Sequence, residues 1–180
     1  MKKLFGFAVC IVMFAGGQVL AVDGLPLSPE LQKLDVSTGR WVYHGETLNT
    51  PFGKAGNWTW NEDCRWSENR IFMTCSFSNV WSGKTVQSLV VDTYNEKDKS
   101  FWHYELFAGG GSGAQPFISK MTINGDTRVE YATGMDHGKK YKTRITYVFD
   151  SPTHVKVKIE ISRYGAHWIT VDQGEGIKQS

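Results

Sequence analysis

The spacing of two cysteines, Cys64 and Cys75, is the sequence feature that indicates a specific chemistry most directly, a disulfide across a hairpin. Both lie in runs in which apolar and polar residues alternate, and this period of two predicts neighbouring β-strands. If Cys64 lies directly opposite Cys75 in an antiparallel hairpin, the two-residue turn falls at residues 69–70. The same register places Trp66 opposite Met73. Because opposed residues have Cα atoms about 4.5–5.5 Å apart, we predict a Cys64–Cys75 disulfide, with two unpaired cysteines packed as small apolar residues as the alternative.

Histidine and carboxylate residues offer only weak candidates for metal binding or catalysis. His103 and Glu105 are two positions apart on a predicted strand, so their side chains should share a face. Asp136-His137 lies between glycines in a turn, but spacing supplies no third ligand for either pair. The glycine-rich segment 109–113 contains a serine without the strand-to-helix context of a nucleophile elbow, and we interpret it as a loop at a barrel mouth. The sequence therefore predicts no cofactor, no metal site and no catalytic residues.

The aromatic residues are the best candidate for a binding site. The chain contains seven Trp and seven Tyr residues, and several recur at alternate positions of predicted strands. Such rings either fill a core or form the walls of a pocket for a planar or apolar ligand. The predicted ligand-binding residues are Trp58, Trp60, Tyr94, Trp102 and Tyr104. The first two have the parity of Cys64, so they should lie on the face of the disulfide.

The elements that must position these residues are almost all strands. One short helix is predicted over residues 29–34, because Ser28 is a favourable N-cap and Pro29 suits the first helical position. Turn signals separate ten runs of strand-like composition: 40–48, 56–66, 70–81, 85–94, 100–108, 116–123, 127–133, 139–149, 153–163 and 167–175. Each run has one apolar and one polar face, and no crossover helix is predicted between them. These runs therefore predict an all-β fold, an antiparallel up-and-down barrel of about eight to ten strands. Closure into a barrel is favoured since it removes exposed strand edges.

The predicted strands 139–149 and 153–163 carry several basic residues. If residues 150–152 turn the chain, Arg144 faces Lys158 across the pair. Two like charges side by side would suit an anionic glycan or a lipid head group, and the alternative is a solvated outer face.

Residues 1–21 have the features of a secretory signal peptide. Lys2 and Lys3 precede an apolar run that is shorter than the roughly 20 residues of a spanning helix, and small residues lead to Ala21. We predict cleavage near Ala21, a single mature domain over residues 22–180 without a transmembrane segment, and a periplasmic or secreted location. Removal of the two lysines leaves 18 basic against 18 acidic residues, and this neutral balance argues against nucleic-acid binding.

Short segments along the chain resemble one bacterial family. They are Gly39-Arg40-Trp41, Cys64-Arg65-Trp66 with Phe72-Met73-Thr74-Cys75, Gly83-Lys84, Tyr94-Asn95 with Lys99, and Ser162-Arg163-Tyr164-Gly165-Ala166-His167-Trp168. Together they resemble the group called "domain of unknown function fifteen-seventy-nine", whose members are often exported. The resemblance covers residues 35–178 and implies a lipocalin-like (calycin) barrel. It implies no activity and no functional residues.

Three functional hypotheses follow from these patterns. The first is an exported barrel that binds a small, partly apolar or aromatic molecule. The second is a non-catalytic structural or partner-binding protein of the envelope that uses an outer face. The third, a hydrolase or isomerase, would need His103, Glu105 or Arg65 gathered around one cavity with shifted pKa values.

Overall fold

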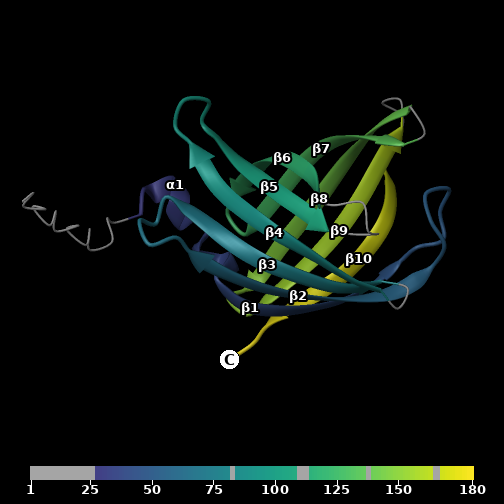
Figure 1. The fold of residues 1–180 in the computed structure, drawn as a ribbon, viewed down its shortest axis with the longest axis horizontal. Helices are drawn as coiled ribbons and strands as arrows, with labels where there is room; N and C mark the ends of the chain where they lie inside the picture. Colours follow the sequence, from purple (N-terminus) through teal and green to yellow (C-terminus); the bar gives the residue numbers. More distant parts are fainter. Residues whose placement is uncertain (1–26, 82–83, 109–113, 137–138, 164–166) are drawn as a thin grey trace, which may run out of the picture.

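Ten antiparallel strands close into a barrel in the computed structural model of the protein (Figure 1). The structure describes residues 27–81, 84–108, 114–136, 139–163 and 167–180. Each strand pairs with its neighbours in sequence, and β1 closes the barrel against β10. The strands are β1 (Gly39–Thr47), β2 (Gly56–Trp66), β3 (Phe72–Trp81), β4 (Lys84–Asn95), β5 (Ser100–Ala108), β6 (Ala114–Asn124), β7 (Thr127–Asp136), β8 (Lys139–Ser151), β9 (His154–Arg163) and β10 (Ile169–Lys178). The predicted fold class and all ten predicted strands are confirmed.

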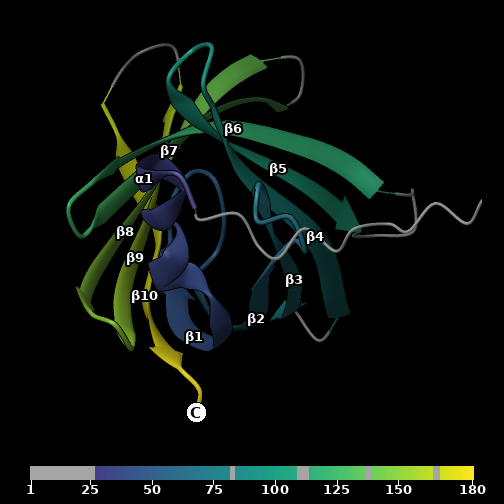
Figure 2. The ribbon, with the colours of Figure 1, turned by 90° about the vertical axis from the view of Figure 1, so that its left-hand side faces the viewer.

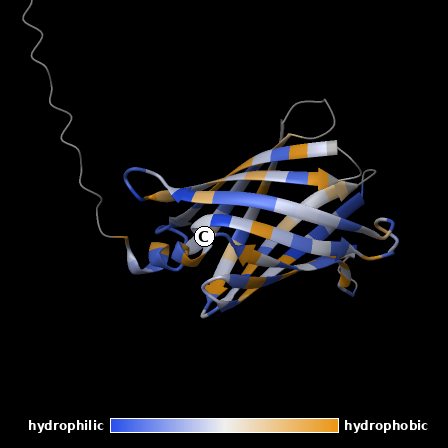
Figure 3. Cartoon of the chain, turned by 90° about the horizontal axis from the view of Figure 1, so that it is seen from below, coloured by the Kyte–Doolittle hydropathy of each residue, from blue (hydrophilic) through white to orange (hydrophobic). Residues whose placement is uncertain are grey.

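Alternation along the strands explains why they close around a core. In β9, Val155 and Val157 are buried, whereas Lys156 and Lys158 are exposed. Figure 3 shows the same succession of hydrophobic and hydrophilic residues along the other strands. Burial of one face of each strand removes apolar surface from water, and the barrel is the shape that buries that face for every strand.

The β2–β3 hairpin has the predicted register but a longer connection than predicted. Cys64 pairs with Cys75, Trp66 pairs with Met73, and the disulfide joins Cα atoms that are 4.0 Å apart. The predicted two-residue turn is wrong, since the amide of residue 67 donates to the carbonyl of residue 72 and leaves four residues between them. Arg70, with φ +54°, is the one residue of this connection with a positive φ. A type I′ turn needs positive φ at two successive residues, which a chain without glycine there avoids by lengthening the loop.

Short helices lie at one end of the barrel (Figure 2), and this end carries the disulfide. The predicted helix is confirmed as α1 (Pro29–Gln32), with the Ser28 hydroxyl accepting a hydrogen bond from the Leu31 amide, and the 3₁₀ helix η1 (Asp35–Ser37) follows it. Between the two helices, Leu34 is fully buried against the disulfide. Apolar packing therefore plugs this end of the barrel on the side of β2–β6.

Two tryptophans hold η1 against the barrel. The indole of Trp66 donates to Asp35 over 2.8 Å, and the indole of Trp41 donates to the carbonyl of Ser37 over 3.1 Å. Because both donors come from strands, they fix the position of the 3₁₀ helix over the barrel end.

The predicted register of β8 and β9 is wrong by two residues. Arg144 pairs with Glu160 rather than with Lys158, and its Nε donates to the Glu160 carboxylate over 2.8 Å. A bulge near residues 149–151 accompanies the shift. A shift of two preserves the face of every side chain while changing its partner, so the expected repulsion between basic neighbours is replaced by an ion pair.

Several predictions fall on residues that the structure does not describe. The signal peptide over residues 1–21, the glycine-rich segment 109–113 and His137 lie outside the described residues. Within the described part of the chain, no helix is long and apolar enough to cross a membrane.

Candidate functional site

Charged side chains occupy the middle of the barrel interior. Asp92 is 1 % exposed, His103 8 %, Arg128 9 % and Glu130 1 %. They take inward positions on β4, β5 and β7. Buried charges are costly unless they are paired and hydrogen-bonded, so the bonds among these four groups determine what the interior can do.

The four groups form one connected network around Asp92. One carboxylate oxygen of Asp92 lies 2.8 Å from Nδ1 of His103, and the other accepts from Nη2 of Arg128 over 3.1 Å. The guanidinium also donates to Glu130 Oε1, over 3.0 Å from Nε and 2.6 Å from Nη2. The second oxygen of Glu130 accepts from the hydroxyl of Ser119 over 3.1 Å. Arg128 is thus held rigidly between two carboxylates.

These contacts determine the protonation of His103. Burial alone would lower the pKa of the imidazole, but the carboxylates of Glu130, Asp92 and Glu105 outweigh it and raise the pKa well above its ordinary value. For Asp92, burial raises the pKa, while Arg128 and His103 outweigh that effect and lower it. At neutral pH the pair is therefore an imidazolium and a carboxylate.

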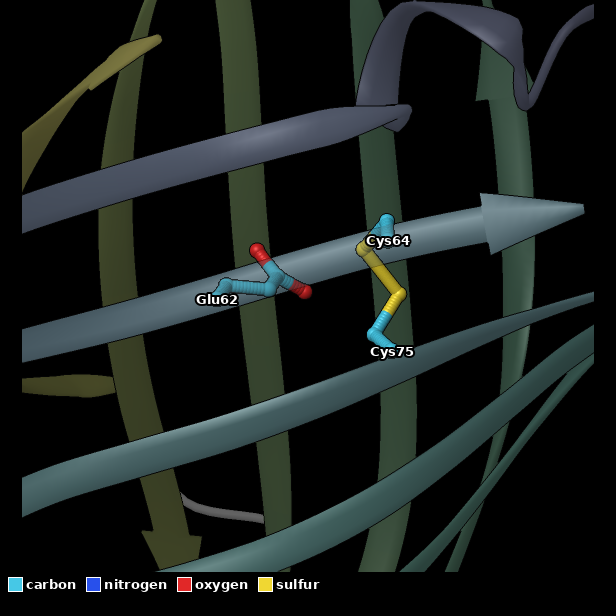
Figure 4. A group of neighbouring side chains, drawn as sticks. All are labelled: Glu62, Cys64 and Cys75. Carbon is cyan, nitrogen blue, oxygen red and sulfur yellow. A yellow bond between two sulfur atoms is a disulfide. The ribbon is translucent and has the colours of Figure 1, made fainter. Parts of the chain in front are cut away.

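Glu62 is a further acidic group of the interior and lies beside the disulfide (Figure 4). Its carboxylate accepts a hydrogen bond from the Tyr43 hydroxyl over 3.0 Å. Burial raises the pKa of Glu62 to about 7, against the opposing effects of Arg128 and the Tyr43 hydrogen bond. Its ligand atom lies within 4.8 Å of both cysteine sulfurs, but the two sulfurs are bonded to each other and supply no thiolate for a metal.

A cavity of about 230 Å³ adjoins this network inside the barrel. Its apolar walls include Trp60, Phe77, Phe107, Phe117 and Tyr147, and its polar lining includes Glu62, His103, Glu105, Arg128 and Glu130. The side-chain oxygen of Asn79, another lining residue, is buried without a hydrogen-bond partner among the described residues. Aromatic walls with a few convergent polar groups are typical of small-molecule sites. The volume is below the ~300–1,000 Å³ of drug-sized sites, so it suits a smaller molecule.

A second space leads toward the barrel end opposite α1. This pocket of about 280 Å³ lies under the β1–β2 connection, residues 48–55, and shares Trp60 and Asn79 with the inner cavity. Trp58 lines it and stacks on Trp60, with ring centroids 4.1 Å apart and planes at 14°. The stacked indoles therefore stand between the mouth of the barrel and its charged interior.

The predicted aromatic wall is only partly assembled. Trp58 and Trp60 face inward as predicted, on the face of the disulfide. Tyr94 also faces inward, but it packs against Phe101 and the apolar cluster at the plugged end, away from the cavity. Of the five predicted residues, Trp60 alone lines the inner cavity.

The prediction that Trp102 and Tyr104 face inward is wrong. Tyr104 is 42 % exposed, and the Trp102 indole donates to Asp98 over 3.1 Å while the Lys120 ammonium lies 4.6 Å from its ring. His103 takes the inward parity of β5 instead. A strand has only one buried face, so aromatic residues at the other parity must lie outside.

The sequence also carried a signal for the charged network, which the aromatic pattern concealed. Asp92 and His103 each stand at an inward-parity position of a predicted strand, next to apolar residues of the same parity. Charged residues are rarely fully buried without a partner. Several of them at inward positions of a meander therefore indicate a polar interior site.

Comparison with known proteins supports the fold and supplies no family. No family model matches the chain, and no curated protein matches it. A solved structure of Rv2717c from M. tuberculosis is similar, with TM-score 0.56, 12 % identity, and coverage of 86 % of this chain and 99 % of that one. The S-type phycobiliprotein lyase CPES from Guillardia theta is also similar, with TM-score 0.54, 13 % identity, and coverage of 86 % and 94 %. At these identities the likeness shows the fold alone, a lipocalin-like barrel.

Proposed function

We propose that the protein binds a small, partly apolar molecule inside its barrel. The observation that carries this proposal is the cavity that joins aromatic walls to a buried, fully paired charged network. Replacement of buried ion pairs by apolar residues is often neutral or stabilising. A barrel that served only as a scaffold would therefore gain no stability from four interior charges beside an unfilled cavity. A binding site, in contrast, needs the charges to orient a ligand and the cavity to hold it.

The cavity offers each part of such a molecule a partner. The rings of Trp60, Phe77 and Phe117 provide apolar contact area, and the unpartnered oxygen of Asn79 accepts a hydrogen bond from a polar group. Nε2 of His103 lies on the side of the imidazole away from Asp92 and is a donor while the ring is protonated.

The proposal extends to location and family. The disulfide favours an oxidising compartment, so we propose that the protein is periplasmic or secreted after loss of residues 1–21. Membership of the family that the sequence resembles stays a prediction. One similar barrel is a phycobiliprotein lyase, so the fold also occurs in a protein that acts on a phycobiliprotein.

The test is native mass spectrometry of the purified protein, followed by binding assays with matched aromatic variants. We expect a small molecule to be retained under native conditions and released on denaturation. Trp60→Ala should lower retention strongly, since Trp60 lines the cavity, and Trp102→Ala, which removes an indole from the outer face, should not. An unaltered mass together with no thermal shift from any compound of a small-molecule panel would refute the proposal.

The two other hypotheses stay predictions. For partner binding, the outer face of β4–β6 places exposed Leu89 beside Leu106 and exposed Tyr104 beside Ile118. For a hydrolase or isomerase, His103 and Glu105 line one cavity and both have shifted pKa values.

Arg65, the third residue of the catalytic hypothesis, is not at the cavity. It pairs with Asp63, and its side chain is 77 % exposed.

A further inference from the structure

We infer that the molecule bound in the barrel is an organic cation, a protonated amine or a similar group on a small apolar body. The inference rests on the proposed function and specifies its ligand class. Three independent features of the interior carry it: an excess of carboxyl groups, the position of the two carboxyl groups that are not hydrogen-bonded to Arg128, and the rings around one of them.

Together with Glu62 and Glu105, the interior network contains more acidic than basic groups. The carboxyl groups are Glu62, Asp92, Glu105 and Glu130, and the basic groups are His103 and Arg128. No lysine is among the described residues that line the cavity. An unbalanced carboxylate in a site shielded from water attracts a positive ligand more strongly than a surface carboxylate does.

The excess is located at Glu62 and Glu105. Asp92 and Glu130 are both bonded to the guanidinium of Arg128. Glu62, in contrast, accepts a hydrogen bond from the neutral hydroxyl of Tyr43, and Glu105 is in a longer ion pair, 3.9 Å from Nε2 of His103. Both of these carboxyl groups line the cavity, so a cation within it has two acceptors that the protein does not already use fully.

Aromatic rings surround Glu62. Trp60 occupies the preceding inward position of β2, Phe77 is the direct partner of Glu62 on β3, and Tyr43 is the direct partner of Trp60 on β1. The ring centroid of Trp60 lies 5.9 Å from that of Tyr43 and 5.5 Å from that of Phe77. Ring faces attract ammonium groups, most strongly where water is excluded. A carboxylate among three rings is a site of matched chemistry for an amine, and it offers an anion only repulsion.

The site also predicts how binding depends on pH. The groups that face Glu62 are Tyr43 from β1, Asp92 from β4, His103 from β5 and Arg128 from β7. The pKa of Tyr43 and of Arg128 is raised and that of Asp92 is lowered, so these three groups keep their charge between pH 6 and 8, and the raised pKa of His103 favours its protonated form. Glu62, with a pKa of about 7, changes from mostly ionised to mostly protonated as the pH falls across this range. A cation should therefore bind about tenfold more weakly at pH 6 than at pH 8.

The experiment compares three probes of nearly equal size by isothermal titration calorimetry. Phenethylamine is cationic, 2-phenylethanol is its neutral counterpart, and phenylacetate is anionic. We expect phenethylamine to bind at least tenfold more tightly than either of the others at pH 8, and to lose about tenfold at pH 6. Glu62→Gln should abolish this preference, whereas Glu68→Gln, which removes an exposed carboxylate from the β2–β3 connection, should preserve it.

Each outcome either supports or overturns the inference. Equal or tighter binding of 2-phenylethanol or phenylacetate overturns it, and so does a neutral or anionic molecule identified in the purified protein; both results leave the proposed function standing. Absence of binding by every probe, with no retained molecule, overturns the proposed function as well. Should Glu62→Gln fail to fold by circular dichroism, Glu105→Gln provides the second test, with a reduced preference expected for the cation.

Discussion

Removal of the Arg128 guanidinium is the most direct test of the buried network. Arg128→Met retains an apolar stem of similar length but deletes the bonds to Asp92 and Glu130, which are both 1 % exposed. Two carboxylates would then remain inside the barrel with only the His103 imidazolium to balance them. Removal of one partner from a buried ion pair typically costs about 3–5 kcal/mol of unfolding free energy. For a chain of this size we expect a fall in Tm of roughly 6–20 °C.

The loss should depend on pH in a defined direction. In the wild type, the neighbours of Asp92 lower its pKa, so its contribution to stability is present above the unfolded pKa and is lost as the pH falls through the folded pKa. In Arg128→Met the carboxyl groups lose that support and become easier to protonate in the folded state. The difference in unfolding free energy between the two proteins should therefore be largest near pH 7 and shrink toward pH 4.

Urea unfolding at pH 7, 5.5 and 4 measures both quantities. The matched control is Arg65→Met, because Arg65 reaches Asp63 over 2.6 Å, the same distance as from Arg128 to Glu130, but on the outer surface. We expect the control to change stability little at any pH, since exposed ion pairs are weak. A loss below about 1 kcal/mol for Arg128→Met at pH 7, or a loss that grows toward pH 4, would refute the view that the guanidinium neutralises buried carboxylates.

Two further predictions concern the plugged end of the barrel. The double variant Cys64→Ser/Cys75→Ser should lose about 3 kcal/mol of unfolding free energy, as expected for closing so short a loop, and urea unfolding with unchanged stability would contradict a disulfide in the folded protein. Leu34→Ala should lose roughly 2–5 kcal/mol because the side chain is 0 % exposed beneath η1, whereas Leu89→Ala on the outer face should lose much less; equal losses would show that the helices do not plug the barrel.

The fold was predictable because its signals are local and repeat along the chain. Alternation in β9 and the shared parity of Trp58, Cys64 and Trp66 identify these segments as strands and show which side chains point into the barrel. Neither signal requires knowledge of distant partners. The details that failed depend on loop geometry. Arg70 adopts a positive φ that its residue type does not favour, and the bulge near residues 149–151 changes the register of β8.

The site was less predictable because it depends on which face of each strand points into the barrel. For β5 the sequence offers two readings, an aromatic face of Trp102 and Tyr104 or the face of Phe101, His103 and Glu105. Judged from β5 by itself, the face of Trp102 and Tyr104 has the larger apolar area of the two. The second reading becomes favourable only when Asp92 from β4 pairs with His103 and when Arg128 from β7 in turn pairs with Asp92. Contacts between strands carry that information, from Asp92 and His103, 11 residues apart, to Asp92 and Arg128, 36 residues apart, and alternation within one strand does not contain it.

The barrel interior separates the residues that stabilise the fold from those that can bind a ligand. At the plugged end Leu34, Met73 and Met121 pack against the disulfide, with each side chain at most 1 % exposed. Toward the middle the inward positions become Glu62 and Asp92, which weaken apolar packing but provide charge beside a cavity. Because strands run through both regions, tight packing at one end can hold the charged groups of the other in fixed geometry. The proposed binding site combines unfilled space with unbalanced charge, and both reduce stability. These losses of stability are confined to the middle of the barrel, and the disulfide and the helices at the plugged end offset them.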